Sequence, residues 1–265
     1  MAKQGKKQGR APDGRGKQHK PSKKGAKGAD GPGGYPAAER PDVVLVVDVA
    51  YLTVADGELV VLLVERGREP HRGRWSVPGV VLDPDEAAAD AAVRAVVARA
   101  GIPDPFVHQE QLDVFDAVGR DPRTRVVSAT VLGVAASARP PAGGTLAGSR
   151  WWPVAALGDP DGPALAFDHG DIVAAGVERL GTRLEHTDLA TALVAEPFTL
   201  GELRRAYEAV WGVELEPANF RRKVLSTPGF VARTAGKRIV GTGRPADLYV
   251  RGGGAVLHPP LPRGR

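Results

Sequence analysis

Two apolar runs rich in β-branched residues, residues 43–54 and 58–66, constrain the fold of this chain most strongly. Only a turn at 55–57 separates them, and that turn contains the pair Asp56-Gly57. Strand-like runs joined by an Asp-Gly turn indicate two paired β-strands. The folded part of the chain is therefore predicted to begin with a sheet.

A helix and further strands are predicted after this pair. Residues 85–100 have the Ala, Val and Arg content that is typical of a half-buried helix. Two strand candidates lie within 108–137, around a turn with Gly, Asp and Pro, and another lies at 151–154. The order of sheet, helix and sheet predicts an α/β fold.

Residues 79–102 follow the frame of the Nudix box. That motif has Gly, five residues, Glu, seven residues, Arg-Glu, an apolar residue, one residue, Glu-Glu, one residue, Gly and an apolar residue. With Gly101 and Ile102 at its end, the frame places Glu86 at the first Glu and Arg94 at the Arg. A Trp followed by Pro-Gly commonly precedes the box, as at 75–79 here. The chain thus resembles a Nudix domain, which implies an α/β/α sandwich.

The residues that hold Mg²⁺ in active Nudix proteins are replaced. The three helix glutamates fall on Ala95, Ala98 and Arg99, and the first Gly falls on Val80. Positions three and four apart share a helix face, and Mg²⁺ needs oxygen ligands that alanine and arginine lack. We therefore expect no metal, no cofactor and no hydrolytic activity. By itself, the helix is equally well explained as an ordinary Ala/Val-rich helix.

Composition narrows the class of protein. The 265 residues are enough for two modest domains, and the chain has no cysteine for a disulfide or a thiolate metal site. It shows no apolar signal region and no apolar run of about 18 residues. A cytoplasmic protein with no membrane partner is expected.

Charge is unevenly distributed along the chain. The net charge is +8 over residues 1–40, −10 over 41–197 and +7 over 198–265. Basic ends around an acidic middle predict that the ends meet a polyanion. Residues 1–40 are poor in apolar residues and are predicted to be a disordered basic tail. Such a tail either adds salt-sensitive attraction to nucleic acid or only keeps the chain soluble.

The C-terminal third predicts a winged helix-turn-helix. Thr199 and Glu202 have the spacing of a capping box, so a helix is expected over 200–210, ending at Gly212. Further elements follow in order: a helix at about 218–226, a strand at 230–234, a basic loop and a strand at 246–251. The predicted domains are a Nudix-like ligand-sensing domain at 41–180, a winged helix at 181–251 and a disordered tail at 252–265.

A winged helix would place its second helix in the major groove, where Arg and Asn bond base edges. The first helix and the wing would contact phosphates, which position the protein without specifying sequence. The predicted DNA-binding residues are Thr199, Arg204, Asn219, Arg221, Arg222, Lys223, Lys237, Arg238 and Arg244. The alternative for the basic segment at 220–223 is a solvated helix face.

Several phrases together resemble the NrtR family of Nudix-related transcriptional regulators. These phrases are RDPR at 120–123, RVVS at 125–128, LAFDH at 165–169, FTL at 198–200, NFRRK at 219–223 and GRPA at 243–246. The resemblance covers about 41–251. It implies a dimeric repressor of NAD-metabolism genes that binds an operator in double-stranded DNA. It also implies that the effector is ADP-ribose or a related nucleotide, and that effector binding releases the operator.

Ligand contacts are expected before the box and on the neighbouring turns, at Arg74, Trp75, Arg120, Arg125, Phe167, Asp168 and His169. Arginines suit a diphosphate because they form bidentate, charge-assisted bonds. Trp75 or Phe167 would stack on adenine. The alternatives are structural: Trp75 in the core, Arg125 paired with an acid, and Asp168 with His169 at a helix start near 171.

Three other functions remain open. The chain would still be a Nudix hydrolase of ADP-ribose-type substrates if Glu86 worked with acids outside the box, such as Asp83, Asp85, Asp113 or Asp116. A regulator of the same architecture could sense a sugar. A nucleotide-binding scaffold without DNA function is the third.

Overall fold

The computed structural model describes residues 42–136, 148–239, 245–254, 256–258 and 260–261. The tail predicted to be disordered at 1–40 lies outside the described residues, as does Arg244 of the predicted wing. No helix in the described ranges is long and apolar enough to cross a membrane.

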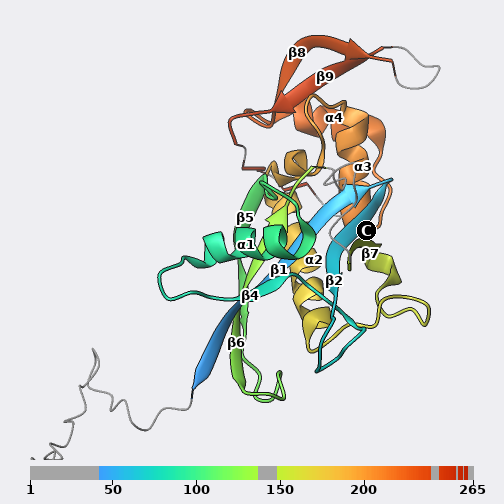
Figure 1. Ribbon diagram of the computed structural model, residues 1–265. Coiled ribbons are helices and arrows are strands. Elements are labelled where there is room, and N and C mark those ends of the chain that lie inside the picture. The colour runs from blue at the N-terminus through green and yellow to red at the C-terminus, as the bar shows by residue number, and fades with distance from the viewer. Residues whose placement is uncertain (1–41, 137–147, 240–244, 255, 259, 262–265) are drawn as a thin grey trace, which may run out of the picture. The chain divides into compact units, whose positions relative to one another are not determined.

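A mixed sheet forms the first half of the described chain (Figure 1). Its main path runs β3-β2-β1-β6-β5, with β4 paired to β1 and β7 paired to β2. The strands are β1 (Val43–Ala55), β2 (Glu58–Glu65), β3 (Trp75–Ser76), β4 (Gly79–Val81), β5 (His108–Phe115), β6 (Arg125–Val134) and β7 (Ser149–Pro153). The predicted hairpin is confirmed: β1 and β2 are antiparallel and meet at Ala55 and Glu58.

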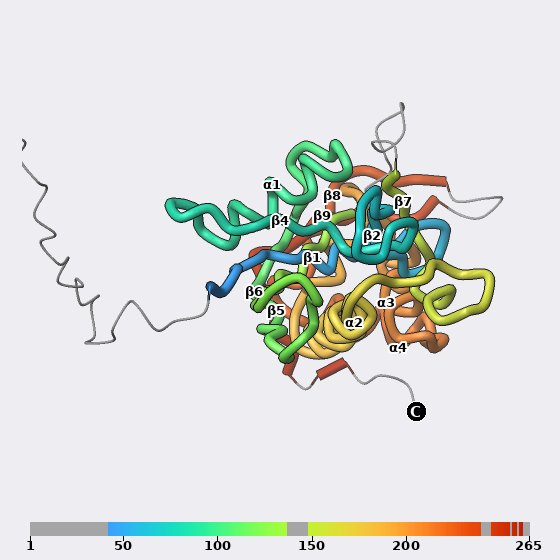
Figure 2. Tube along the Cα trace, turned by 60° about the horizontal axis from the view of Figure 1, so that its bottom comes forward, coloured from blue at the N-terminus to red at the C-terminus, as the bar shows by residue number. Residues whose placement is uncertain are grey.

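Strand β1 sends alternate side chains to opposite faces of the sheet. Val47, Val49 and Tyr51 pack with the buried alanines of helix α1 (Ala88–Ala100). Ala50 and Leu52 face the other way, onto the apolar side of helix α2 (His169–His186). Figure 2 shows α1 and α2 on opposite sides of β1. The Nudix-like α/β/α sandwich is confirmed.

The C-terminal elements form the predicted winged helix. They are the short 3-10 helix η3 (Leu189–Leu193), α3 (Leu200–Trp211), α4 (Pro217–Ser226) and the antiparallel pair β8 (Val231–Arg238) and β9 (Ala246–Arg251). Gly212 ends α3 in the left-handed conformation, with φ +65°. Strand β8 is longer than predicted, so Lys237 and Arg238 lie on the strand instead of in the loop.

One apolar core joins the two predicted domains. It runs from β1 and α2 into α3, α4 and Tyr249 of β9. The Trp211 indole also donates to the carbonyl of Gly181 at 3.1 Å. The predicted boundary between 180 and 181 falls inside α2, because the apolar face of that helix serves both halves.

Of the tail predicted to be disordered at 252–265, residues 255, 259 and 262–265 lie outside the described residues, and two of the others are packed. Leu257 and Leu261 are buried. Their backbone N–H groups donate to the carbonyls of His186 and Glu185 at 2.8 and 2.9 Å. Leu257 and Leu261 therefore lie against the end of α2.

The capping box at the start of α3 gives a test of the winged helix. Thr199 Oγ1 accepts from the Glu202 N–H at 3.1 Å, and the Glu202 carboxylate accepts from the Thr199 N–H at 2.7 Å. We expect Thr199→Ala to lower the free energy of unfolding by about 1 kcal/mol, measured by denaturant titration. Thr199→Ser keeps the capping oxygen and should lose less. Equal losses in the two variants would show that the cap does not stabilise the domain.

Candidate functional site

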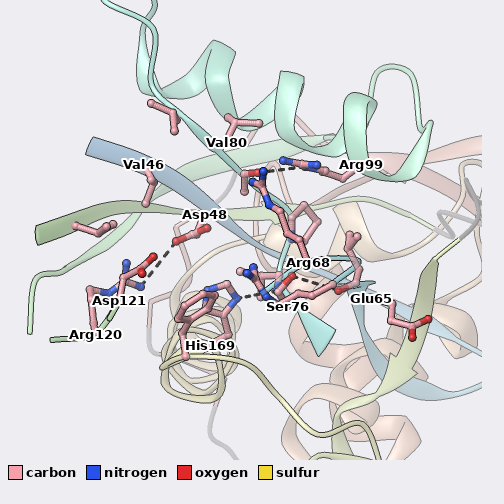
Figure 3. Close-up of a pocket in the computed structure, with 18 of the residues that line it drawn as sticks. Val46, Asp48, Glu65, Arg68, Ser76, Val80, Arg99, Arg120, Asp121 and His169 are labelled. Carbon is pink, nitrogen blue, oxygen red and sulfur yellow. Dashed lines mark hydrogen bonds and ion pairs between the residues drawn. The ribbon is translucent and has the colours of Figure 1, made fainter. Parts of the chain in front are cut away.

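A polar cavity of about 220 Å³ opens at the edge of β4 and the end of α1 (Figure 3). Its walls come from β1, β2 and the loop after it, β4, the turn at 120–123 and the segment 167–169 that begins α2. Segments far apart in the sequence therefore meet there. Charged side chains from several of them face the cavity.

A buried ion pair lies on one side of this cavity. Arg120 donates to both carboxylate oxygens of Asp168, at 2.6 and 2.8 Å. A second acid, Asp48 of β1, lies 3.8 Å from the same guanidinium and accepts from Ser128 Oγ at 2.7 Å. The side chain of Arg120 is 5% exposed, so these contacts are shielded from water. They tie β1, the 120–123 turn and the start of α2 together.

The pairing of β4 with β1 beside Asp48 requires a glycine at position 79. A Cβ built on Gly79 would stand 2.0 Å from Asp48 Oδ1, closer than any real contact. The two residues are partners in the β1–β4 ladder. The close approach of β4 to Asp48 thus depends on the missing side chain of Gly79. Val80, which stands at the position of the first Gly of the Nudix box, lines the cavity.

Four arginines give the cavity a positive side: Arg66, Arg68, Arg99 and Arg123. Arg123 is paired with Asp121 at 2.5 Å. Arg66 lies over the ring of Phe167, 4.5 Å from its centroid, and its buried Nη2 has no hydrogen-bond partner among the described residues. Burial and the positive charges of Arg123, Arg68 and Arg99 lower the pKa of Arg66. An anion in the cavity would accept a hydrogen bond from this Nη2 and would offset the repulsion between the arginines.

Phe167 holds its place with a strained backbone. Its φ is +52°, a conformation that bulky residues rarely adopt. The ring stands between Arg66 and His71, which meets it edge-on with centroids 4.7 Å apart. Strain of this kind gathers at ligand sites, where the surrounding structure holds it in place.

The residues of the box do not fit a Mg²⁺ ion. Ala95 is buried against the sheet, Ala98 has no donor atom, and Arg99 brings a positive charge. Glu86 is held by Arg94, whose guanidinium lowers the pKa of this carboxyl. No cluster of three or more His, Cys, Asp or Glu side chains suited to a metal occurs among the described residues. Positions 95, 98 and 99 were predicted to share one face of the helix. Of the three, only Arg99 lines the cavity.

The predicted ligand residues fall into two groups. Arg120, Phe167 and His169 line the cavity, and Asp168 is bound to Arg120 behind it. The other three, Arg74, Trp75 and Arg125, do not line it. Trp75 packs on Trp152 with centroids 5.3 Å apart, as in the core alternative, and Arg125 donates to backbone carbonyls instead of pairing with an acid.

Seven other charged residues line the cavity and were not among the predicted ligand contacts: Asp48, Glu65, Arg66, Arg68, Arg99, Asp121 and Arg123. A signal existed for two of them, because 66–74 holds four arginines directly after a predicted strand. Arg66 and Arg68 line the cavity and Arg74 does not, because the loop turns back after Pro70 and the Arg74 carbonyl accepts from the Arg66 N–H at 2.8 Å.

The predicted DNA contacts are also unequally placed. Asn219, Arg221 and Arg222 are exposed on α4, and Arg222 donates to Asn219 Oδ1 at 2.9 Å. Lys223 is half-buried on the same helix, and Lys237 is exposed on β8. The exposed basic residues among these are therefore Arg221 and Arg222 on α4 and Lys237 on β8.

Three predicted contacts have internal partners. Arg204 is held by Glu208 at 2.6 Å and by the Leu215 carbonyl. Arg238 is held by Glu202 at 2.8 Å and by the Pro197 carbonyl, and the hydroxyl of Thr199 is buried in the capping box. Their visible role is to join elements within the winged helix.

An arginine-lined cavity in a Nudix-like sandwich, built onto a winged helix with an exposed basic helix, defines a Nudix-related DNA-binding regulator. Two family models match the chain: the NUDIX domain over residues 43–175 and the NrtR DNA-binding winged helix domain over residues 190–250. The chain belongs to the NrtR family of Nudix-related transcriptional regulators.

Relatives agree in sequence and structure. The ADPR responsive transcriptional repressor NtrR of Acinetobacter baylyi is 32% identical over 217 residues, covering 81% of this chain and 84% of its own. Shewanella oneidensis NrtR, crystallised with a 27mer DNA, is 29% identical with a TM-score of 0.70, covering 78% of this chain and 93% of that one. A MutT/nudix family protein from Enterococcus faecalis shares the fold at 23% identity, with a TM-score of 0.66 over 80% of this chain and 88% of that one.

The Arg120–Asp168 pair should be essential for folding. Arg120→Ala leaves Asp48 and Asp168 buried without their cation, so we expect a loss of about 3–5 kcal/mol in the free energy of unfolding. Arg125→Ala is the matched control, because that arginine is more exposed and bonds only carbonyls. Denaturant unfolding of both variants measures the difference. Similar small losses would contradict a stabilising role for the pair.

His169 should make stability depend on pH. Its Nδ1 accepts from the Val77 N–H at 3.0 Å, so the ring is neutral there. Burial lowers the pKa of His169 despite the nearby Asp48 and Asp168. The unfolded chain therefore takes up this proton first, and stability should fall as the pH drops below about 6.5.

The measurement is the unfolding free energy between neutral and mildly acidic pH. His169→Gln keeps a neutral acceptor and should flatten the fall, whereas His186→Gln, an exposed histidine at the other end of α2, should not. An unchanged slope in His169→Gln would mean that other groups cause the dependence.

Proposed function

We propose that this chain is an effector-responsive transcriptional regulator, of the repressor type, that binds operator DNA through α4. Its Nudix-like domain would sense ADP-ribose or a related nucleotide, and the regulated genes would be those of NAD metabolism. The observation that carries the proposal is the cavity's excess of arginine donors beside the start of α2, the helix whose core is shared with the winged helix. The ADPR-responsive repressor from A. baylyi supports the choice of effector.

The cavity suits a nucleotide diphosphate. Guanidinium groups bind phosphate oxygens through paired, charge-assisted bonds. Arg66, Arg68 and Arg99 have no carboxylate partner among the described residues. The Nε atoms of Arg66 and Arg99 donate to the carbonyls of Pro70 and Gly79, and their remaining donors are left for a ligand. Among the described residues no group of three or more His, Cys, Asp or Glu side chains is arranged to hold a metal, so in this proposal the domain binds the nucleotide without hydrolysing it.

The exposed side of α4 suits a major groove. Asn219, Arg221 and Arg222 stand on this helix, and the pKa of Asp247 on β9 is lowered by Arg233 first and, less strongly, by Arg221. In the proposed complex α4 reads bases and the wing contacts the backbone. A homodimer would place two such helices on the two halves of an operator.

Selection of binding sites from random duplex DNA tests this function. Purified full-length chain should enrich one two-fold symmetric sequence, and ADP-ribose should lower the affinity for it. Linkage requires that the selected DNA lower the affinity for ADP-ribose by the same factor. The same samples with MgCl₂ should yield no AMP. Steady AMP production would support the hydrolase alternative, and failure to enrich a sequence would support a scaffold.

Two arginines of α4 should carry the sequence specificity. Arg221→Ala with Arg222→Ala should weaken operator binding by about 1–3 kcal/mol for each base that an arginine no longer binds, while ADP-ribose affinity stays unchanged. Arg72→Ala with Arg74→Ala removes the same charge from the loop after β2 and is the control. Electrophoretic mobility shifts at fixed salt measure both. Equal effects of the two double variants would sink the recognition-helix assignment.

A further inference from the structure

Arg99 occupies the position at which a box glutamate would hold the metal. It lies in the last turn of α1 and its side chain lines the cavity. The guanidinium Nε lies 3.4 Å from the Gly79 carbonyl, a long contact that does not consume its other donors. Figure 3 shows Arg99 beside Val80, above the cavity, with the side chain of Arg68 extending toward it from the opposite wall.

The arginines of the cavity fall into two groups, those with a carboxylate partner and those without one. Arg120 and Arg123 are bound to Asp168 and Asp121, so their charges are balanced locally. Arg66, Arg68 and Arg99 have no such partner in the described ranges, and Arg66 holds a buried donor without an acceptor. Three cations that face one space repel one another and exclude a further cation. They attract an anion of high charge for the same reason.

A metal would have little to bind here. Asp48 is bound to Ser128 and lies near Arg120, and Asp121 is bound to Arg123. Asp48 and Asp121 therefore already have partners, and the other carboxylate that lines the cavity is Glu65, an exposed residue at the end of β2. A divalent cation would have to break these bonds and lie beside unpaired arginines. The free-energy cost of doing so exceeds the gain from coordination by a single carboxylate.

We propose that Arg99 replaces the divalent metal, so that the cavity binds the diphosphate of its nucleotide without Mg²⁺. Arg99 and Arg68 bind the phosphates from opposite walls, and Arg66 donates from its free Nη2. This rests on the proposed function and names how its site works. A guanidinium supplies charge and paired donors to phosphate but does not generate a hydroxide from water, as a bound metal does.

Calorimetric titration of the full chain with ADP-ribose, in EDTA and then in MgCl₂, tests the proposal. The affinity should be the same in both buffers. Arg99→Ala should weaken binding in EDTA by roughly 10- to 100-fold, the loss expected for charged hydrogen bonds. Arg99→Lys keeps the charge without the fork and should lie between the two. Arg72→Ala, an exposed arginine that does not line the cavity, should bind like the parent chain.

Arg99 is exposed, so these variants should unfold at the parent temperature, which a thermal melt checks. Affinity that requires Mg²⁺, or that survives Arg99→Ala unchanged, would overturn the proposal while leaving ADP-ribose as the effector. Inorganic pyrophosphate is the second probe. If it binds in EDTA in an Arg99-dependent manner while ADP-ribose does not bind, the arginine site stands and the proposed effector is wrong. If neither anion binds, both are wrong.

Discussion

The alternation of side chains along β1 is the constraint on which the rest of the structure depends. Val47, Val49 and Tyr51 pack against α1, and Ala50 and Leu52 pack against α2. One strand therefore positions the helices on both faces of the sheet. Its parallel pairing with β6 runs from Val43 to Leu52 without a break. The polar exception within this run is Asp48, which points to the edge where Gly79 lets β4 approach. Asp48 thus brings one carboxylate from a buried strand to the wall of the cavity.

Helix α2 connects this cavity to the winged helix. Its first turn holds His169, which accepts from Val77, and the neighbouring Asp168 holds Arg120. Its last turns pack with α3, where Trp211 bonds the Gly181 carbonyl, and with the segment that ends at Leu261. In the proposed function, an anion that draws Arg66 or Arg120 changes the contacts that hold the start of α2. A rigid helix transmits such a change to its other end, provided that the two ends have alternative arrangements.

Local signals predicted the fold well, because each strand pair, cap and turn is written in neighbouring residues. The Asp-Gly turn, the capping box at Thr199 and the helix end at Gly212 all depend on short-range geometry. The cavity was predicted only in part. Its arginines come from a loop, a helix end and a turn, and which of 66–74 face inward is set by the way the chain reverses after Pro70. Such reversals depend on packing between distant segments, which residue spacing does not encode.

Replacing a metal by an arginine changes what happens to the ligand after a sensor domain binds it. A metal site binds phosphate and also activates water, so its ligand is consumed while it is read. An arginine site gains affinity from the same charge but leaves the ligand intact. Its occupancy then follows the concentration of the nucleotide, and the shift between two states of the chain follows the difference in affinity of those states. In the proposed function the alanines at 95 and 98 withdraw the chemistry, and Arg99 returns the binding energy that their loss would otherwise remove.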